Sequence, residues 1–583
     1  MITTHKTQPE TRTFTWEGGD LFYRHWAPAE PSSRVVFLFH RGHEHSGRMS
    51  EVAAGMPEDV HVVAWDARGH GRSPGRRGFA PNGFASMVDD MDAFVRGICI
   101  ELDIHLRDAV IVAHSVAAVV AATWIHDRNP GVRAAVLATP AFRVRLYIPF
   151  ALPGLRVVDR LKPEATISSY VKGKLLTHDS DQAAAYDDDE LISKNISNRV
   201  LVGMSAAAKR VVDDAAAITT PVLMIQAGAD WVVDNRVQDR FFKNLGSYCK
   251  QRLDIADAYH AVFHELDRAD TIGAVAGFIS ERFALEQQTA PSRPGNAAVH
   301  ARLQQDLSPL SPRRLAFALT RAAMRGPGRL SHGIRTGWRH GFDSGVMLDH
   351  VYDNRPSGST PVGRAIDRVY LDSIGWRGIR MRKEHLESVL REAIDQHLRA
   401  AGHAHVADIA GGPGRYLQDA LIAAADDRIA IRCRDRDPVG LADGRALAAE
   451  RGLSGISYEA GDAFDPASIA ELGDWAQVII ASGIYELFAD NELISRSLDA
   501  IAAALPVGGH LIYTNQPWHP QLEFIARVLV NRDQDPWVMR CRPQAEIDAL
   551  VATAGFVKQR TLSDPWGIFT VSVAVKVAAG NDD

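Results

Sequence analysis

The chain has 583 residues, which is too long for one ordinary hydrophobic core, so we expect more than one domain. Its composition is that of a globular protein, and its net charge of -6 is small for this length, which argues against nucleic-acid binding. The four cysteines have neither metal-site nor disulfide spacing, which indicates a reducing, cytoplasmic location. The apolar stretches fall short of a membrane span, and the N-terminal residues lack a signal-peptide pattern.

Two separate blocks alternate short β-rich runs with helical patterns, which predicts two α/β domains with parallel sheets. The first block covers residues 12–286. The second covers 345–578, with a helical lead-in before a core at 403–578. Between them, residues 287–344 are rich in Pro, Ser and Gln and then in Arg, which predicts a linker followed by a basic helical connector.

The connector has an uneven charge distribution, with seven arginines and no acidic residue in 307–342. One interpretation is a solvated, basic face on connecting helices. The other is a surface that meets anionic lipid, which would place the protein peripherally at the inner membrane surface.

In the first block, Arg34–His40 is a predicted strand, and residues 108–125 predict a strand, a sharp turn at Ser115 and a helix. A serine at such a turn projects its hydroxyl above the edge of the sheet. Asp230 and His260 each follow a further predicted strand, and the chain order Ser, Asp, His is that of α/β-hydrolases.

A serine hydroxyl becomes a good nucleophile when an imidazole takes its proton and a carboxylate orients that imidazole. The oxyanion of the intermediate needs backbone N–H donors, for which we expect the amides of Gly42 and Val116. Alternatives remain open for the other members of the triad. Asp234 or Asp257 could replace Asp230, and His264 could replace His260. His40, His43 and His45 could bind a metal, but they lie in the predicted oxyanion stretch, so we expect no metal site.

Five segments of the first block carry a resemblance to a known family: HRGHEHSGR, WDARGHGRSPG, the Ser115 turn, GADWVVD and AYHAVFHELD. Over 12–286 the chain resembles the monoacylglycerol lipase and lysophospholipase branch of the α/β-hydrolases, of the serine aminopeptidase S33 type. The resemblance implies a helical cap at about 140–219. It also implies the site residues, with Ser115 as nucleophile, Asp230 as acid, His260 as base, and Gly42 and Val116 as the oxyanion hole.

The sequence departs from the family pattern at the turn that carries the serine. The usual G-x-S-x-G is replaced here by Ala113-His114-Ser115-Val116-Ala117, and Arg41 and His43 replace residues that are commonly small. This departure favours a second hypothesis, in which the first domain is an inactive docking module. The complete set of Ser115, Asp230 and His260 favours an active hydrolase.

In the second block, residues 405–422 predict a strand, a glycine-rich turn and a helix. Such a turn lets a ligand approach the backbone closely, and by itself it suits a dinucleotide equally well. A second strand ends at Asp435, at about the separation expected for an acid that binds ribose hydroxyls. A third strand leads to Asp462, and the chain closes with a predicted terminal hairpin, which favours a methyltransferase over a nicotinamide oxidoreductase.

The segments DIAGGPGRY, CRDRDP, GDAFD, SGIYELF and YTNQPWHPQLE resemble class I S-adenosylmethionine-dependent methyltransferases over 345–578. Similar domains occur fused behind α/β-hydrolases in bifunctional bacterial proteins. The resemblance implies S-adenosylmethionine as cofactor and a Rossmann-like fold. The implied cofactor-binding residues are Asp408, Gly411, Gly412 and Gly414 for the methionine part, Asp435 for ribose, and Asp462 and Ala463 for adenine.

The methyl acceptor is expected after the fourth and fifth strands of this block, where the candidates are Tyr485, Glu486, Gln516, Trp518 and His519. Glu486 or His519 could remove a proton from an oxygen or nitrogen acceptor, and a structural hydrogen-bonding role is equally open for each. Cys433 is interpreted as a packed strand residue. The sequence thus predicts a bifunctional enzyme that acts on small-molecule or lipid substrates, with an acylglycerol-like or lysophospholipid-like ester for the first domain.

Overall fold

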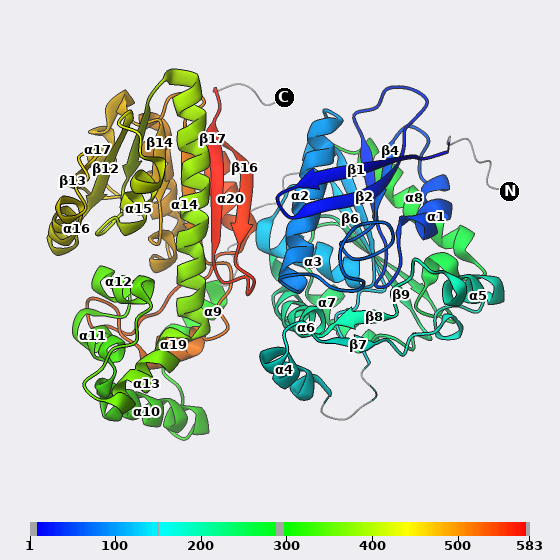
Figure 1. The fold of residues 1–583 in the computed structure, drawn as a ribbon, viewed down its shortest axis with the longest axis horizontal. Helices are drawn as coiled ribbons and strands as arrows, with labels where there is room; N and C mark the ends of the chain where they lie inside the picture. The colour runs from blue at the N-terminus through cyan, green and yellow to red at the C-terminus, as the bar shows by residue number, and fades with distance from the viewer. Residues whose placement is uncertain (1–7, 146, 148–150, 287–296, 579–583) are drawn as a thin grey trace. The chain divides into compact units, whose positions relative to one another are not determined.

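The computed structural model describes residues 8–145, 147, 151–286 and 297–578. The chain divides into two compact units, Met1–Pro291 and Ser292–Asp583. Each unit contains one large β-sheet with helices on both faces (Figure 1). Among the described residues, no helix combines the length and the apolar character that crossing a bilayer requires.

The first unit is built on an eight-stranded sheet in the order β1-β2-β4-β3-β5-β6-β9-β10. Its N-terminal strands β1 and β2 run antiparallel, and the strands from β4 to β10 in the sheet order run parallel. Every residue of β3, β5, β6 and β9 is buried, because helices cover both faces. The strands are β1 (Glu10–Trp16), β2 (Gly19–Trp26), β3 (Val35–Phe39), β4 (His61–Trp65), β5 (Ala109–His114), β6 (Ala134–Ala138), β9 (Val222–Ala227) and β10 (Lys250–Ile255).

Two hydrophobic clusters lie on the two faces of this sheet. On one face, α2 (Phe84–Glu101) and α3 (Val116–Arg128) pack against alternate strand residues such as Phe37. On the other face, α1 (Ser50–Ala54) and α8 (Arg268–Ala284) pack against the intervening residues. This is the predicted α/β-hydrolase fold, and it is confirmed.

The described residues between β6 and β9, where we expect a helical cap, form three α-helices and a small two-stranded sheet. The sheet pairs Thr166–Ser168 with Asn195–Ser197 and is a feature that the sequence pattern does not indicate. The helices are α4 (Ala151–Leu161), α5 (Ser180–Asp188) and α6 (Asn198–Asp213), and α7 (Asn235–Asn244) follows β9.

The second unit has a seven-stranded sheet in the order β13-β12-β11-β14-β15-β17-β16. The first five strands in this order run parallel, and the last two form an antiparallel hairpin that joins β15. The hairpin confirms the predicted Rossmann-like methyltransferase fold. The strands are β11 (Ala404–Asp408), β12 (Ile429–Asp435), β13 (Ile456–Ala460), β14 (Val478–Ala481), β15 (His510–Asn515), β16 (Phe556–Ser563) and β17 (Thr570–Lys576).

Helices cover both faces of the second sheet. One cluster joins α14 (Ile374–Ala401), α15 (Arg415–Ala424) and α16 (Pro438–Glu450) to one face. The other face is covered by α17 (Pro466–Ala470), α18 (Asn491–Ala504) and α20 (Gln544–Thr553).

The residues before 345 differ from the expected connector. Their helices belong to the second unit, because Phe342 is buried in a cluster that also contains Leu371, Trp376 and Ile525. The boundary expected at 345 therefore lies too late, since the apolar face of this segment has its packing partners in the second unit. The helices are α9 (Ala297–Gln304), α10 (Pro312–Arg325), α11 (His332–His340), α12 (Gly345–Asp353), α13 (Pro361–Leu371) and α19 (Leu522–Val528).

Candidate functional site

Ser115 lies in the sharp turn between β5 and α3, at φ 58° and ψ -112°. A non-glycine residue at positive φ is strained, and such strain is concentrated at functional sites. The turn is held by two backbone hydrogen bonds, from Ser115 N–H to Ala138 O (2.9 Å) and from Ala141 N–H to Ser115 O (3.1 Å). Ala113 and Ala117 are both buried beside it, so the strained turn forms with alanine at the positions that glycine usually occupies.

Ser115, His260 and Asp230 form a connected, buried chain of hydrogen bonds. His260 Nε2 lies 2.7 Å from Ser115 Oγ, and His260 Nδ1 lies 2.7 Å from Asp230 Oδ2. Asp230 Oδ1 accepts the N–H groups of Val232 (2.7 Å) and Val233 (2.9 Å). Burial alone would raise the pKa of Asp230, but the charge and hydrogen bond of His260 and these N–H donors lower it. The carboxylate is therefore held in its ionised form beside the imidazole.

The loop that carries His260 is held by two residues that the sequence analysis missed. His114 Nε2 lies 3.0 Å from His260 O, and Thr139 Oγ1 donates to the same carbonyl at 3.1 Å. Burial lowers the pKa of His114 well below its ordinary value, so it is a neutral donor. The available sequence signal for His114 was its position at the end of a predicted strand, whereas Thr139 follows β6, which the sequence analysis did not predict.

The two predicted oxyanion residues lie against each other. Val116 is the first residue of α3, where an N–H has no acceptor within the helix. A methyl group added at Gly42 would come within 3.0 Å of Val116 Cγ2. The turn after β3 therefore packs directly onto the start of α3, next to Ser115.

The alternative triad residues have other partners. Asp234 caps α7 by accepting Arg236 N–H at 3.2 Å and pairs with the Arg236 guanidinium at 2.9 Å. His264 Nε2 lies 3.1 Å from Arg48 O. The structure thus brings together Asp230 and His260 rather than Asp234 or His264, and no hydrogen bond joins Asp257 to His260 among the described residues.

The histidines after β3 do not converge on one point. His40 Nδ1 lies 2.7 Å from Arg41 O, and His45 Nε2 lies 2.8 Å from Asp189 Oδ2. The part of the chain that the structure describes contains no cluster of His, Cys, Asp or Glu that could hold a metal. Between these histidines, Glu44 is fully buried between Arg41 (2.8 Å) and Arg48 (2.7 Å), which makes this turn a rigid, charged element.

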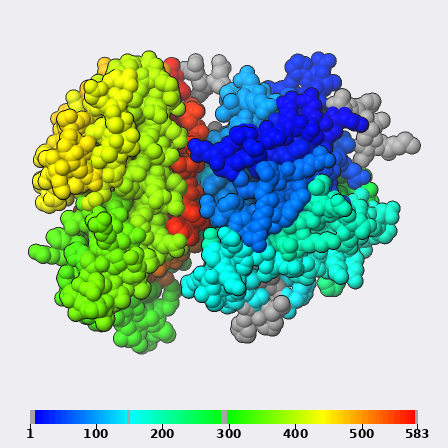
Figure 2. Space-filling view, in the orientation of Figure 1, coloured from blue at the N-terminus to red at the C-terminus, as the bar shows by residue number. Residues whose placement is uncertain are grey.

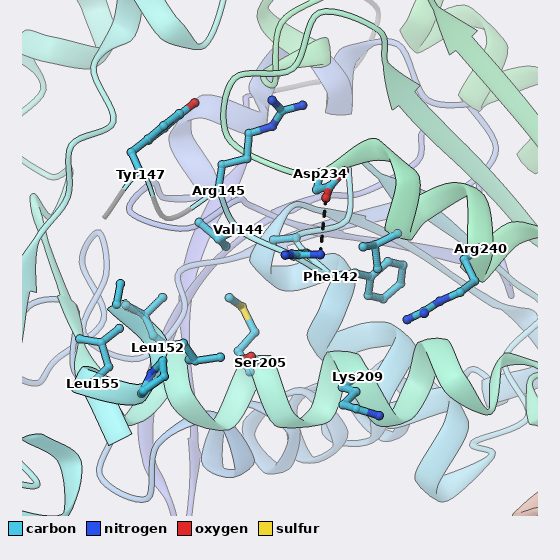
Figure 3. A pocket seen from close by; sticks show the side chains of 17 residues that line it. Phe142, Val144, Arg145, Tyr147, Leu152, Leu155, Ser205, Lys209, Asp234 and Arg240 are labelled. Carbon is cyan, nitrogen blue, oxygen red and sulfur yellow. Dashed lines mark ion pairs between the residues drawn. The ribbon is translucent and has the colours of Figure 1, made fainter. Parts of the chain in front are cut away.

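A pocket of about 710 Å³ lies between the cap helices α4 and α6, the segment after β6 and the start of α7 (Figure 3). Apolar side chains of α4, α6 and the segment after β6, including Leu152, Leu155 and Phe142, form much of its wall. Basic groups also line it, among them Lys209 of α6 and Arg240 of α7. Ala141, which donates to Ser115 O, belongs to the same wall. The pocket therefore combines apolar surface with positive charge, and it connects to the serine turn through Ala141, while the side chains of Ser115, Asp230 and His260 do not line it.

In the second unit, the glycine-rich turn follows β11. Gly412 and Gly414 have φ values of 54° and 64°, which favour glycine. A methyl group at Gly411 would come within 2.6 Å of Cys433 Sγ, so this position has no room for a side chain. Cys433 itself is a buried strand residue, as expected.

Asp435, at the end of β12, is joined to this turn. Its Oδ2 accepts Gly412 N–H at 2.8 Å, and its Oδ1 accepts Asp437 N–H at 2.9 Å. Asp462 lies after β13, with its carboxyl group 38% exposed and 4.0 Å from the Arg436 guanidinium. Ala463 is buried beside it, and its carbonyl accepts Ser497 Oγ–H at 2.6 Å. The carboxyl ends of three neighbouring strands thus bring the predicted cofactor residues to one edge of the sheet.

Asp408 is completely buried at the end of β11. Its Oδ1 accepts Ala410 N–H at 2.9 Å, and its Oδ2 accepts the Tyr416 hydroxyl. Burial raises the pKa of Asp408 to about 7. The structure records no Lys or Arg ion pair for this carboxyl within the described chain, so a cationic ligand would relieve the cost of ionising it.

The second unit also contains an apolar cavity of about 290 Å³ next to the ends of β14 and β15. Glu486, Gln516 and His519 line it, whereas Tyr485 and Trp518 do not. The expectation for Tyr485 is therefore wrong, because its ring packs in the core and its hydroxyl lies 3.1 Å from Ser497 Oγ. The aromatic residues of the cavity wall are Phe342, Tyr370, Trp376, Phe524, Trp537 and Phe569.

Two polar groups of the wall are buried, and their partners belong to the protein. Glu486 Oε1 accepts Arg382 at 3.0 Å, and Glu486 Oε2 is buried with no hydrogen-bond partner among the described residues. Burial lowers the pKa of His519 to about 4, so its imidazole is neutral, and its Nδ1 accepts Gln521 N–H at 3.0 Å. The sequence analysis missed Arg382. The sequence could have indicated it, because Arg382 lies three residues after Ile379 and four before Leu386 and so falls on the buried face of a helix.

Fold and sites together define a hydrolase-fold unit fused to a methyltransferase-fold unit. Residues 30–267 match the family described as "Serine aminopeptidase, S33", and residues 275–576 match the family described as "Putative methyltransferase". The chain belongs to this methyltransferase family, carries an S33-type hydrolase domain at its N-terminal end, and is a homologue of the Escherichia coli K12 protein YnbC.

The curated relatives fall into two groups. YnbC, described as "Uncharacterized protein YnbC", is 44% identical over 573 residues, which cover 95% of this chain and 96% of that protein. "Phospholipase YtpA" of Bacillus subtilis is 26% identical over 267 residues, 44% of this chain and 98% of that protein. Human "Monoglyceride lipase" is 25% identical over 272 residues, 43% of this chain and 86% of that protein. The predicted resemblance of both halves is confirmed.

Proposed function

We propose that the chain is a bifunctional enzyme in which the first unit hydrolyses an ester and the second transfers a methyl group from S-adenosylmethionine. The observation that carries the hydrolase proposal is the pair of 2.7 Å contacts that connect Ser115 Oγ, His260 and Asp230. The location is the cytoplasm, which the four cysteines support because none of them forms a disulfide bond among the described residues.

In the first unit, Ser115 Oγ attacks the ester carbonyl while His260 Nε2 takes its proton. The negative charge that develops on the carbonyl oxygen is met by the N–H groups of Gly42 and Val116. The leaving alcohol takes the proton from His260, which leaves an acyl group on Ser115. Water, activated by the same imidazole, then releases the acid, and Asp230 keeps the imidazole in the required tautomer throughout.

The ester is of the acylglycerol or lysophospholipid type. Two features support this substrate class. The pocket between the cap helices and α7 presents apolar side chains together with Lys209 and Arg240, which suits an acyl chain with a polar or anionic head. The relatives that match the first unit include proteins described as a phospholipase and a monoglyceride lipase.

The competing hypothesis is an inactive docking module, which the alanine-flanked turn favoured. The strained conformation of Ser115 and its contact with His260 both form in the presence of Ala113 and Ala117. An inactive module has no need to maintain this strain, so the geometry supports the active enzyme.

In the second unit, the residues present fit the methyl donor. Gly412, where an added methyl group would meet only Asp435 Oδ2 at 4.0 Å, leaves the backbone open to a ligand, and Asp408 offers a buried carboxyl group to the cationic methionine part. Asp435 retains acceptor capacity for the ribose hydroxyls, and the exposed carboxyl of Asp462 suits the adenine amino group. When bound, S-adenosylmethionine supplies an electrophilic methyl group.

The chain's own residues around the apolar cavity hold the acceptor and manage its proton. Glu486 Oε2 is available to accept a proton, and the Asp343 carboxyl lines the same cavity. His519 Nδ1 accepts Gln521 N–H, so the proton of its neutral ring lies on Nε2, which can donate a hydrogen bond to the acceptor. The aromatic side chains exclude water from the acceptor atom and bind the apolar part of the acceptor. The acceptor is therefore a molecule with substantial apolar surface.

Calorimetric titration of the full chain tests the class of cofactor. We expect S-adenosylhomocysteine to bind and NAD to give no heat of binding, and we expect Asp435→Ala to weaken S-adenosylhomocysteine binding at least about tenfold, since it removes an acceptor of charge-assisted hydrogen bonds. Binding of NAD in place of S-adenosylhomocysteine would assign the second unit to the oxidoreductases and contradict the proposal.

A further inference from the structure

Helix α10 exposes leucines on the side that faces away from its own unit. Leu315 and Leu319 are each 63% exposed, and Leu310, just before the helix, is 93% exposed. The partly buried positions of α10 are Phe317 and Met324, which pack on the cluster that contains Phe342. At 3.6 residues per turn, Leu315 and Leu319 fall one turn apart on the face opposite to Phe317. The helix therefore has one apolar stripe for the core and a second that meets solvent.

The segment that carries the outward leucines is strongly basic. All seven arginines of residues 307–342 are exposed except Arg321, which is half-buried, and no acidic residue lies in that segment. Arg313 pairs with Glu523, and Arg325 stacks on the ring of Trp338 at 4.5 Å. An amphipathic helix with leucines flanked by arginines places its apolar side chains among acyl chains and its guanidinium groups at lipid phosphates.

This surface lies at the mouth of the apolar cavity. Val369 of α13 lines the cavity and is also 74% exposed, so it marks the opening. Met324 of α10 and Ile334 of α11 belong to the same wall. Val362, which is also on α13, is 62% exposed. Figure 2 shows these helices, in green, as a lobe at one end of the second unit.

We infer that α10 and α13 form a docking surface for an anionic lipid bilayer, and that the methyl acceptor is an amphiphile that enters the cavity from that bilayer between Met324 and Val369. The part that concerns the acceptor rests on the proposed methyltransferase function, whereas the docking surface does not. Residues 307–342, for which the sequence predicted either a solvated basic face or a lipid-binding surface, form part of a folded lobe, so only their outer face is available to lipid.

Sedimentation of the full chain with vesicles tests the docking surface. Vesicles of equal parts phosphatidylglycerol and phosphatidylcholine are compared with pure phosphatidylcholine vesicles. We expect binding to the anionic vesicles, and Leu315→Asp/Leu319→Asp should weaken it at least about tenfold, because two leucines lose their burial in the bilayer. Arg314→Glu/Arg329→Glu should remove the preference for anionic vesicles.

A matched control is available elsewhere in the second unit. Val507 and Val557 are 64% and 49% exposed outside these helices, so Val507→Asp/Val557→Asp should leave vesicle binding unchanged. Circular dichroism melts confirm that each variant is folded. Deletion of residues 307–342 is not a usable variant, because Phe342 and Ile334 are buried in the core of the unit.

Three results would overturn the inference: absence of vesicle binding by the folded wild type, equal binding to neutral vesicles, or unchanged binding of the leucine variant. A dimer in analytical ultracentrifugation that the leucine variant abolishes, without any vesicle binding, would assign the surface to a second copy of the chain instead. Binding of S-adenosylhomocysteine, measured separately, reports on the proposed methyltransferase function. Loss of that binding with vesicle binding intact would remove the cofactor assignment alone.

Discussion

The guanidinium of Arg382 lies 3.0 Å from the carboxylate of Glu486, and both side chains are about 5% exposed. Arg382 comes from α14, and Glu486 follows β14, so the pair connects the long helix to the edge of the sheet that faces the cavity. Arg382 also lies over the ring of Phe569, 5.1 Å from its centre. The carboxylate of Glu486 is thereby kept in an apolar wall where an unpaired charge would be costly.

Removing one member of this pair should therefore cost more than removing both. Arg382→Met leaves a buried carboxylate without its cation, and we expect the free energy of unfolding of the second unit to fall by about 3–5 kcal/mol. The double variant Arg382→Met/Glu486→Leu should recover most of this loss, because two apolar groups replace the ion pair. Urea denaturation measures both values. Additive losses would show that the pair does not act as a unit.

The buried carboxyl of Asp408 predicts opposite effects on stability and on cofactor binding. Its pKa is raised from 3.8 to about 7, so the folded protein binds a proton that the unfolded chain has released. The contribution of this group to stability therefore falls as the pH rises from about 4 to 7. Asp408→Asn should stabilise the ligand-free protein at pH 8, measured by thermal unfolding.

The same substitution should weaken binding of S-adenosylhomocysteine, whose ammonium group needs the ionised carboxylate. In the wild type, affinity should rise between pH 6 and pH 8, and in Asp408→Asn this rise should be absent. Asp462→Asn is the control, because its carboxyl is 38% exposed and should weaken binding without changing the pH dependence. An unchanged pH dependence in Asp408→Asn would contradict the assignment.

The contact between Gly42 and Val116 predicts that a substitution at Gly42 impairs the hydrolase and that a second substitution at Val116 rescues it. A methyl group at Gly42 would lie 3.0 Å from Val116 Cγ2 and push the two N–H donors apart. We expect Gly42→Ala to lower kcat for p-nitrophenyl butyrate by up to about 10²-fold, with KM nearly unchanged, since a lost oxyanion donor costs about that much. Adding Val116→Ala removes the crowding and should restore much of kcat. A double variant no better than the single one would place the oxyanion donors elsewhere.

The turn after β3 depends on the charge of Glu44. Burial opposes its ionisation, yet the positive charge of Arg41 and Arg48 keeps the pKa of Glu44 well below its usual value of 4.5. This group stabilises the fold above pH 4.5, and its contribution is lost as the pH falls below that value. Glu44→Gln should lower stability at pH 7 by about 3 kcal/mol, with a smaller difference at pH 4.

An exposed ion pair gives the matched control for Glu44. Glu51 is about half exposed and pairs with Arg268 at 2.5 Å, so Glu51→Gln should change stability by less than about 1 kcal/mol. Urea denaturation at both pH values measures the two variants side by side. Equal effects of the two substitutions would show that burial does not strengthen the Glu44 pair.

Much of the fold follows from local sequence pattern. Strand β5 is fully buried, strand β11 is buried except at His405, and both are largely apolar runs that lead to a functional residue, a pattern that is recognisable without a structure. The strand–turn–helix pattern around Ser115 and the glycine-rich turn at 411–414 are equally local. For these reasons both α/β folds and the Ser115, Asp230 and His260 set could be predicted.

The features that the sequence did not predict depend on packing between distant segments. Arg382 is an ordinary helix residue until Glu486, 104 positions later, lies against it. The composition of residues 287–344 indicates a linker, yet Phe342 is buried against residues of α13, α14 and α19. Tyr485 was placed in the acceptor site by its position after a strand, and its side chain turns to Ser497 instead. Residues 287–296 of the predicted linker lie outside the described residues.

The central claim, that Ser115 is an activated nucleophile, is tested most directly by labelling the purified full chain with a fluorophosphonate probe. The account predicts strong labelling of the wild type and none of Ser115→Ala, because only an imidazole-activated hydroxyl reacts at a useful rate. Phenylmethylsulfonyl fluoride, a smaller reagent, controls for obstruction by the cap. If the folded wild type reacts with neither reagent, the hydrolase assignment is contradicted, and the first unit is a docking module for the methyltransferase.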